Sequence, residues 1–495
     1  MNLATLLDIA VSVAGDRPAL AAAGRRWDVA GFAARAQRRA GELSGRAARS
    51  GAGTVAYLGE AGPQFVEALY ASGLAGLTFA PLNYRLRDDA LGPLLAGLGP
   101  ALLGHGPGMR DRARALAAGR EVVSFDPDPP DLDTELPDVD PEQVAVSLYT
   151  SGTTARPKAV LLRHRHLTSY VVGSAEPGAA ADGETALVAV PPYHIAGVMG
   201  VVTALYAGRR MVFLPRFSAA DWLALARQER VTHAFVVPTM LARIVDELER
   251  DPHGAPGQLR HLAYGGGPCG EPLIRRALAG FGPRVGFVNA YGLTETSSTI
   301  AVLGPDDHRA ALDSADPRVQ ARLGSVGRAL PGVSLAVLDE DRRPLPAGAA
   351  GQVAVRGAQV SGEYRSRRDA GPDVYFVTGD RGYLDDEGFL FLLGRADDMI
   401  IRGGENIAPA DVEAVLRQHP AVRDVAAVGI PDPEWGAVVG AVVVLATPVD
   451  DATLTGWARE RLSSFKVPAR FLRADQLPYS DTGKLLRRQL VELFR

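Results

Sequence analysis

The middle of the chain alternates short apolar runs with longer amphipathic stretches, and this alternation constrains the fold more than any other feature. Between residues 210 and 293 the runs are RMVFLP, DWLALARQERV, HAFVVP, TMLARIVDELE, HLAYGGG and RVGFVNAYG. Strands that alternate with helical patterns are typical of α/β sheets. The first hundred residues show the same pattern around TVAYLG and GLTFAPLN. The sequence therefore predicts an α/β protein.

The length of the chain and its proline-rich segment indicate how it is divided into domains. With 495 residues it exceeds what one hydrophobic core usually organises, so we expect at least two domains. Residues 126–142, DPDPPDLDTELPDVDPE, form an acidic, proline-rich connector that cannot build a core. From about residue 325 the pattern becomes mostly strand and turn, which indicates a small β subdomain. The last hundred residues suggest an α+β unit whose first helix begins near Pro409, with Asp411 and Glu413 complementing the helix dipole.

Composition excludes several classes of protein. The 53 basic and 57 acidic residues give a formal charge of −4 without a long basic run, so a nucleic-acid partner is not expected. The single cysteine, Cys269, cannot form an internal disulfide, and no signal-peptide pattern opens the chain, so we expect a cytoplasmic protein. Residues 186–208 are uncharged, but Pro191 and Pro192 break them, which favours a strand, a loop and a helix over a membrane span. Oligomeric state is left open.

A loop rich in hydroxyl groups follows the connector. The stretch YTSGTTARPKAV lies between two apolar runs and reads as a turn between strands. Hydroxyls, backbone N–H groups and a lysine ammonium suit a polyphosphate, although such a turn on its own is usually only a turn. The Walker spacing is absent. The candidate phosphate-binding residues are Thr150, Ser151, Gly152, Thr153, Thr154 and Lys158.

Lysine is rare in this chain. Only three of the 53 basic residues are lysines, namely Lys158, Lys466 and Lys484, and each lies in a turn or loop. A compact ammonium differs from a planar guanidinium where one point charge must reach between oxygens. This placement indicates functional lysines, although chance survival in an arginine-biased composition is the alternative.

Five ordered motifs carry a resemblance to a known family. YTSGTTARPKAV, YGLTET (291–296), TGD (378–380), GRADDMIIRGGENI (394–407) and TGK (482–484) resemble, in order and spacing, the adenylate-forming superfamily, which includes acyl-CoA and aryl-CoA ligases. The resemblance runs from about residue 20 to the C-terminus. It implies a large N-terminal domain (1–396) of two α/β subdomains and a β subdomain, followed by a small mobile α+β domain (397–495).

The resemblance also implies a reaction and its residues. A carboxylic acid would attack the α-phosphate of ATP, forming an acyl-adenylate with loss of pyrophosphate. Glu295 would hold Mg²⁺, Thr294 would reach the α-phosphate, and Lys484 would bridge the attacking carboxylate and the phosphate. Besides the loop, the implied ATP-binding residues are Asn289, Ala290, Tyr291, Gly292, Asp380 and Arg395.

A second half-reaction is implied for the C-terminal part. Asp397 resembles the hinge about which that domain turns after adenylation. Thioester formation with a thiol, coenzyme A in the first instance, would then use a different face of the domain. The implied coenzyme A region comprises Gly404, Trp435, Gly436 and Lys466.

Substrate class is partly readable by comparison with relatives that activate amino acids. They carry an aspartate near the segment that begins at His194, whereas residues 194–197 here contain no acid, so an acid without an α-amino group is expected. His194 resembles a gate residue, and small side chains could leave room for an acyl, aryl or polycyclic chain. The implied pocket residues are His194, Gly197, Gly265, Gly266 and Gly267.

Two departures and three alternatives accompany this interpretation. Ala155 and Ala159 stand where the family usually has glycine, which would stiffen the loop if either position needs a positive φ. The alternatives to an acid–coenzyme A ligase are an enzyme that loads a carrier protein, a luciferase-like oxygenase and a ligand-binding pseudoenzyme.

Overall fold

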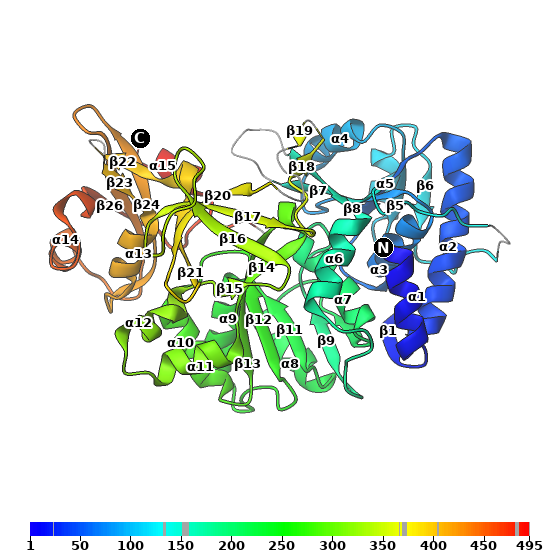
Figure 1. Cartoon of the computed structure of the whole chain (residues 1–495), viewed down its shortest axis with the longest axis horizontal. Helices are drawn as coiled ribbons and strands as arrows, with labels where there is room; N and C mark the ends of the chain where they lie inside the picture. The colour runs from blue at the N-terminus through cyan, green and yellow to red at the C-terminus, as the bar shows by residue number, and fades with distance from the viewer. Residues whose placement is uncertain are drawn as a thin grey trace.

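The computed structural model describes residues 1–22, 24–131, 135–150, 158–365, 367–368, 374–402, 405–480 and 485–494. Two mixed sheets with their helices form most of the molecule, and a smaller antiparallel sheet lies beside them (Figure 1). The C-terminal elements are gathered at one end of the long axis, opposite the N-terminal helices. The α/β fold class is confirmed.

The first sheet has eight strands in the order β19, β18, β8, β7, β4, β3, β5 and β6. Strands β3 to β7 pair in parallel, whereas β8 and β18 are antiparallel additions at one edge. Its strands are β3 (Thr54–Leu58), β4 (Thr78–Pro81), β5 (Ala101–His105), β6 (Val122–Ser124), β7 (Val144–Thr150), β8 (Lys158–Arg163), β18 (Glu363–Tyr364) and β19 (Arg367–Arg368). The helices of this part are α1 (Leu3–Ala14), α2 (Val29–Ser50), α3 (Pro63–Leu74), α4 (Asp88–Gly97), α5 (Arg110–Leu116) and α6 (His164–Ser174).

The second sheet has nine strands in the order β15, β14, β13, β12, β11, β9, β10, β1 and β2. Its central strands are parallel, as the alternating pattern predicts. The strands are β1 (Pro18–Ala22), β2 (Arg25–Asp28), β9 (Thr185–Val188), β10 (Arg210–Phe213), β11 (His233–Val236), β12 (His261–Gly265), β13 (Gly286–Leu293), β14 (Ser298–Leu303) and β15 (Arg328–Ala329). The helices are α7 (Ile195–Tyr206), α8 (Ala219–Gln228), α9 (Pro238–Leu248), α10 (Glu271–Phe281), α11 (Pro305–Asp313) and α12 (Pro317–Ala321), with short 3-10 turns η1 (Thr294–Thr296) and η2 (Arg322–Gly324).

The predicted β subdomain is an antiparallel sheet in the order β16, β17, β20 and β21. Its strands are β16 (Val333–Leu338), β17 (Gly351–Gly357), β20 (Phe376–Leu384) and β21 (Leu390–Arg395). A single 3-10 turn, η3 (Ala396–Asp398), leads from β21 into the C-terminal part. The candidate hinge Asp397 is the middle residue of this turn.

The C-terminal part is an α+β unit, as expected from the sequence. Its main sheet has the order β24, β25 and β26, and a two-stranded sheet of β22 and β23 precedes it. The elements are β22 (Ile400–Arg402), β23 (Glu405–Ile407), α13 (Pro409–Arg417), β24 (Val422–Asp432), β25 (Gly436–Leu445), α14 (Asp451–Arg459), η4 (Ser464–Lys466), β26 (Arg470–Arg473) and α15 (Arg487–Glu492). Helix α13 contacts β21 of the β subdomain, and Arg417 of α13 lies against Gly270, the residue before α10. The C-terminal unit therefore contacts both the β subdomain and the part of the chain that contains the second sheet.

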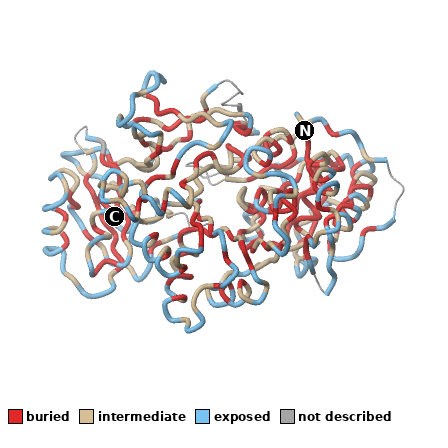
Figure 2. The backbone as a smooth tube through the Cα atoms, turned by 60° about the horizontal axis from the view of Figure 1, so that its bottom comes forward, coloured by how far each residue is buried: buried red, intermediate tan, exposed pale blue. Residues whose placement is uncertain are grey.

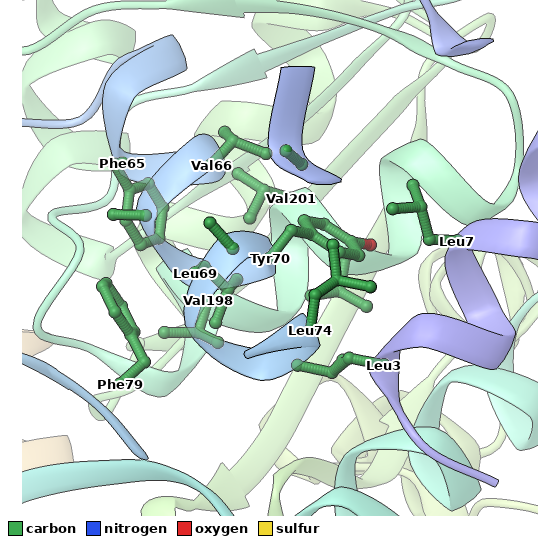
Figure 3. Packing of buried hydrophobic residues seen from close by; sticks show 14 of the residues in the cluster. Leu3, Leu7, Phe65, Val66, Leu69, Tyr70, Leu74, Phe79, Val198 and Val201 are labelled. Carbon is green, nitrogen blue, oxygen red and sulfur yellow. The ribbon is translucent and has the colours of Figure 1, made fainter. Parts of the chain in front are cut away.

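One hydrophobic core joins the two α/β parts. Figure 3 shows Leu69 and Tyr70 of α3 packed close to Leu3 of α1 and Val198 and Val201 of α7. All five side chains are almost fully buried. Since α3 covers the first sheet and α7 follows a strand of the second, their shared packing fixes the two sheets relative to each other. Buried segments are concentrated inside the helical layers, whereas the peripheral loops are exposed (Figure 2).

The uncharged segment 186–208 forms β9, a loop and α7, as its prolines predict. The strand ends at Val188, and Pro191 and Pro192 lie in the loop that follows, where the missing proline N–H breaks no ladder. No helix among the described residues is long and apolar enough to cross a membrane.

We expect acid to destabilise the protein through buried neutral histidines. His164 is buried, its Nδ1 accepts a hydrogen bond from the Leu3 N–H at 3.2 Å, and burial lowers its pKa to about 4. The unfolded chain takes up a proton near pH 6.5 and the folded chain only near 4, so stability falls as the pH drops between these values. In His164→Asn the amide oxygen can accept the same hydrogen bond but does not titrate. Between pH 6.5 and 5 the free energy of unfolding, measured with urea, should fall less steeply than in the parent protein, by about 1 kcal/mol per pH unit. An unchanged slope would contradict this role.

Candidate active site

Asp380 is the most firmly held acidic residue of the candidate site. It lies on β20 with 9% of its surface exposed and is paired with Arg395 on β21. Arg395 Nη1 donates to Asp380 Oδ1 at 3.0 Å and also to the Thr378 carbonyl at 3.1 Å. The Tyr291 hydroxyl donates to Asp380 Oδ2 at 2.6 Å. Each carboxylate oxygen still has a lone pair available for a ligand hydroxyl.

The same contacts shift two pKa values. Burial raises the pKa of Tyr291, and the neighbouring Asp380 carboxylate raises it further, so the phenol stays protonated and donates. Burial lowers the pKa of Arg395, but the charge of Asp380 and its hydrogen bond raise it, and the net shift is upward. The negative charge of Glu295 contributes to the upward shift of the Arg395 pKa.

Glu295 is positioned by a tight turn at the carboxyl end of β13. It is the central residue of η1, and Thr296 closes the turn by bonding the Leu293 backbone at 3.0 Å. Ser297 and Ser298 follow with φ of 54° and 104°, values that non-glycine residues rarely adopt. Backbone strain of this kind persists where surrounding contacts impose it, commonly at functional sites. Thr294 lies in the same turn, so the structure brings the two candidate residues together.

Four of the implied ATP-binding residues lie on β13 itself. The Asn289 amide donates to the Ser325 carbonyl at 3.1 Å, which engages that side chain within the fold. The Tyr291 ring packs against the core around Ile300 while its hydroxyl reaches Asp380. The sequence interpretation placed Tyr291 among the ATP-binding residues, and it did not foresee the hydrogen bond. Ala290 and Gly292 complete the strand.

The hydroxyl-rich loop joins antiparallel strands, as expected. Thr150 ends β7 and Lys158 begins β8, and the two residues are opposite one another in the ladder. Thr150 Oγ1 donates to the Lys158 carbonyl at 3.4 Å. The other candidate residues, Ser151, Gly152, Thr153 and Thr154, lie outside the described residues, as does the departure Ala155.

His194 lies at the start of α7 and is largely desolvated. Its Nε2 atom is buried and has no hydrogen-bond partner among the described residues. Burial, together with the positive charge of Arg85, lowers its pKa to about 3, so the ring is neutral at physiological pH. The ring also contacts Tyr193 at a centroid distance of 4.4 Å. A neutral imidazole with an open nitrogen suits a residue that contacts a bound substrate.

The glycines of the predicted pocket have a backbone explanation as well. A Cβ at Gly265 would lie 2.1 Å from the Ala290 carbonyl oxygen, so only glycine allows β12 to approach β13 this closely. At Gly197 the corresponding distance to the Pro191 carbonyl oxygen is 2.4 Å. Gly266 has a φ of 81°. Gly265 therefore keeps β12 close to β13, Gly197 lets α7 lie against the loop at Pro191, and Gly266 takes a backbone conformation that favours glycine, reasons that the sequence alone did not reveal.

Three of the predicted coenzyme A residues, Trp435, Gly436 and Lys466, lie in the described portion of the C-terminal unit. Trp435 is 45% exposed, and Arg402 lies over its ring at 5.6 Å. Arg402 Nη1 also donates to the Phe465 carbonyl at 2.8 Å, next to Lys466. Lys466 pairs with Asp411 at 2.6 Å. Gly436 begins β25. Gly404 and the candidate catalytic Lys484 lie outside the described residues.

Tyr364 is a residue that the sequence interpretation missed. Its hydroxyl donates to Glu295 Oε1 at 2.8 Å, although the two residues are 69 positions apart. Tyr364 belongs to β18, which pairs with β8. The sequence offers no local signal for this contact, because strand pairing of such short segments depends on the assembled sheet.

Two family profiles and several characterised proteins match this sequence. The sequence profile described as AMP-binding enzyme matches residues 7–365, and that of the AMP-binding enzyme C-terminal domain matches residues 411–484. A 2-succinylbenzoate–CoA ligase from Bacillus licheniformis is 37% identical over 353 residues, 70% of each chain. A feruloyl-CoA synthase from an Amycolatopsis species is 35% identical over 454 residues, 89% of this chain and 88% of the relative.

Solved structures give the same result. The o-succinylbenzoate CoA synthetase (MenE) of Bacillus subtilis in complex with the acyl-adenylate intermediate OSB-AMP has a TM-score of 0.83 and 31% identity, covering 98% of this chain and 97% of the other. ATP-bound MatB from Rhodopseudomonas palustris has a TM-score of 0.86 and 29% identity, with 100% and 99% covered.

The chain belongs to the AMP-binding enzyme family, the adenylate-forming superfamily that its motifs resemble. Within that family it is an AMP-forming acid–thiol ligase of the acyl-CoA synthetase class, which uses ATP, Mg²⁺ and coenzyme A. The predicted fold, with a large N-terminal and a small C-terminal domain, is confirmed.

Proposed function

We propose that this enzyme activates a carboxylic acid without an α-amino group, most suitably an aryl acid, and transfers it to coenzyme A in one site. The observation that carries the proposal is the hydrogen-bonded group of Tyr291, Asp380 and Arg395, beside which Glu295 occupies the turn that follows β13. It presents a buried acid for ribose hydroxyls, a cation for phosphate and a second acid for a metal ion. Such convergent groups are what a nucleotide requires.

Within this proposal Asp380 accepts hydrogen bonds from the ribose hydroxyls and Arg395 holds the acid in place. The loop between β7 and β8 contacts the outer phosphates through its hydroxyls and Lys158. Glu295 is the metal-binding residue, since Mg²⁺ is commonly held by one or two carboxylates together with substrate phosphates. A bound ion would supply positive charge that offsets the phosphates, and Glu295 would be one of the residues that hold it.

The two half-reactions would use the C-terminal domain differently. In the first, an oxygen of the substrate carboxylate bonds to the α-phosphorus and pyrophosphate leaves, with Lys484 offsetting the converging negative charges. In the second, the thiolate of coenzyme A attacks the acyl carbonyl and AMP leaves. Asp397, in the turn between β21 and β22, is the proposed pivot between residues 1–396 and 397–495. The cluster around Trp435, Gly436 and Lys466 is the proposed contact region for coenzyme A.

The proposed acid class rests on two features. Residues 194–197 offer no carboxylate to pair with an α-ammonium, and relatives that share a third or more of the aligned residues are named for the aryl acids 2-succinylbenzoate and ferulate. The neutral His194 is the proposed contact between the acyl pocket and the reacting centre.

ATP–pyrophosphate exchange with a panel of acids tests the proposal. The panel contains 2-succinylbenzoate, ferulate, a medium-chain fatty acid and an α-amino acid, and AMP release is then followed with and without coenzyme A. We expect exchange with an aryl acid and AMP release that depends on coenzyme A. Exchange only with the amino acid would overturn the acid class. AMP release that requires a carrier protein would overturn the acceptor, and no exchange with any acid would favour the pseudoenzyme.

We also expect Glu295→Gln to raise the Mg²⁺ concentration needed for half-maximal exchange by about tenfold or more, because an amide is a weaker ligand for a hard cation. The measurement is a Mg²⁺ titration at fixed ATP and acid, with thermal unfolding as the check on folding. A titration that superimposes on the unmodified enzyme would remove Glu295 from the metal site.

A further inference from the structure

A short segment of the chain, residues 361–365, connects Glu295 to the strand that leaves the phosphate loop; we call it the tether. On one side it is bonded to β8. Tyr364 pairs with Val160, the Arg365 N–H donates to the Ala159 carbonyl at 3.1 Å, and Ser361 Oγ donates to the Leu161 carbonyl at 2.5 Å. These bonds hold three consecutive residues of β8.

An ion pair strengthens the same attachment. Arg163, the last residue of β8, donates to both carboxylate oxygens of Glu363 at 2.9 and 2.7 Å. Both side chains are largely buried, with 22% and 13% of their surface exposed. A two-bond arginine–carboxylate contact fixes direction as well as distance. The tether is therefore oriented relative to β8 rather than merely adjacent to it.

On its other side the tether is hydrogen-bonded to both the backbone and the side chain of Glu295. The N–H groups of Ser361 and Gly362 both donate to the Glu295 carbonyl, at 2.9 and 3.2 Å. The Tyr364 hydroxyl donates to Glu295 Oε1 at 2.8 Å. The backbone bonds set where Glu295 lies, and the phenol sets how its carboxylate is turned.

A phenol is well suited to this task. A glutamate carboxylate rotates freely about its last bond unless a donor holds one oxygen. An arginine or lysine donor would neutralise the charge that attracts a cation, whereas a neutral hydroxyl leaves that charge in place. One oxygen is thereby occupied, and the second oxygen keeps its lone pairs for a metal ion. Partners that orient a metal ligand commonly change affinity or activity by about 10- to 100-fold when removed.

We propose that Tyr364 is the positioning residue for the Glu295 carboxylate, and that the tether couples this acid to the phosphate-loop strand. This inference rests on the proposed function, because it requires Glu295 to be the metal-binding acid. Through the tether, the acid and the loop that contacts the phosphates share one rigid support. A metal ion held by Glu295 would then be supported by the same part of the chain as the strand that leaves the phosphate loop.

The test is Tyr364→Phe, which removes one oxygen and keeps the ring. In ATP–pyrophosphate exchange the Mg²⁺ concentration for half-maximal rate should rise about tenfold. The rate at saturating Mg²⁺ should change much less, and thermal unfolding should stay close to that of the parent enzyme. The matched control is Tyr375→Phe, since the ring of Tyr375 packs under Arg356 in the β subdomain. An unchanged Mg²⁺ requirement, or a loss of rate that saturating Mg²⁺ does not recover, would overturn the assignment.

A double variant separates this inference from the proposed function. If Tyr364 acts through Glu295, adding Tyr364→Phe to Glu295→Gln should raise the Mg²⁺ requirement no further. Additive effects of the two substitutions would show that Tyr364 acts elsewhere and would overturn the inference. A normal Mg²⁺ titration for Glu295→Gln itself would contradict the metal assignment. If Glu295→Gln raised the Mg²⁺ requirement and Tyr364→Phe did not, the positioning role of Tyr364 would be contradicted while the metal assignment of Glu295 would stand.

Discussion

Lys484→Ala should slow pyrophosphate release by about 10²- to 10³-fold, the loss typical of removing one group that stabilises charge in a transition state. The carboxylate and the α-phosphate are both anionic as they converge, and a lysine ammonium between them offsets their repulsion. Lys484 lies just before the described segment that begins at Leu485 and continues into α15. Arg488→Ala, an exposed position on that helix, is the matched control for loss of nearby positive charge.

The same variant should keep the second half-reaction. When it receives a synthetic acyl-adenylate and coenzyme A, thioester should form at close to the parent rate, because the α-phosphate has already been attacked. Thioester yield from the synthetic adenylate is therefore measured beside pyrophosphate release. A loss of both activities, or a loss with Arg488→Ala as large as with Lys484→Ala, would contradict a role confined to adenylation.

The sequence predicted those parts of the fold in which local pattern and tertiary structure agree. The alternating runs from residue 210 to residue 293 became the parallel strands β10 to β13 and the helices α8 to α10 between them. The β subdomain and the C-terminal α+β unit were also predicted, because their local sequence patterns agree with the elements that they form. The segment 186–208 was assigned correctly because two prolines and a histidine are incompatible with a membrane helix.

Pairing over long distances in the chain was not predictable. Strands β1 and β2 come from residues 18–28 but join the far edge of the second sheet, where Leu20 is opposite Met211. Strand β18 likewise returns to the first sheet beside β8, about 200 residues earlier in the chain. Each is a short strand whose partner is chosen by the assembled sheets rather than by its own residues. The two α/β units are consequently interwoven.

The candidate site shows the same division. Motif order indicated Glu295, Asp380 and Arg395, and the structure pairs Asp380 with Arg395 at 3.0 Å and places Glu295 in the turn after β13. The Tyr291–Asp380 and Tyr364–Glu295 hydrogen bonds were missed, because they join residues 89 and 69 positions apart. A tyrosine in a strand carries no sign of the acid that its hydroxyl will meet. Likewise, Gly265 reads as a small pocket residue until the Ala290 carbonyl is seen beside it.

Asp397→Pro should have the opposite effect to Lys484→Ala. Asp397 is the middle residue of the single 3-10 turn η3, a conformation whose φ of roughly −50 to −70° proline can adopt. Proline then fixes this φ and prevents the rotation that the second half-reaction needs. Pyrophosphate release should be largely kept, whereas thioester formation from the synthetic adenylate should fall by about 10²-fold or more.

Asp397→Ala is the control that separates rotation from charge, since it removes the carboxylate but leaves φ free. It should form thioester far faster than Asp397→Pro. If alanine and proline were equally defective, the carboxylate and not backbone rotation would be the cause. If Asp397→Pro lost pyrophosphate release while still converting the synthetic adenylate, the pivot would lie elsewhere. If one site serves both half-reactions in turn, Asp397→Pro should lose thioester formation and Lys484→Ala should lose pyrophosphate release. Each substitution would then block a different orientation of the same C-terminal domain.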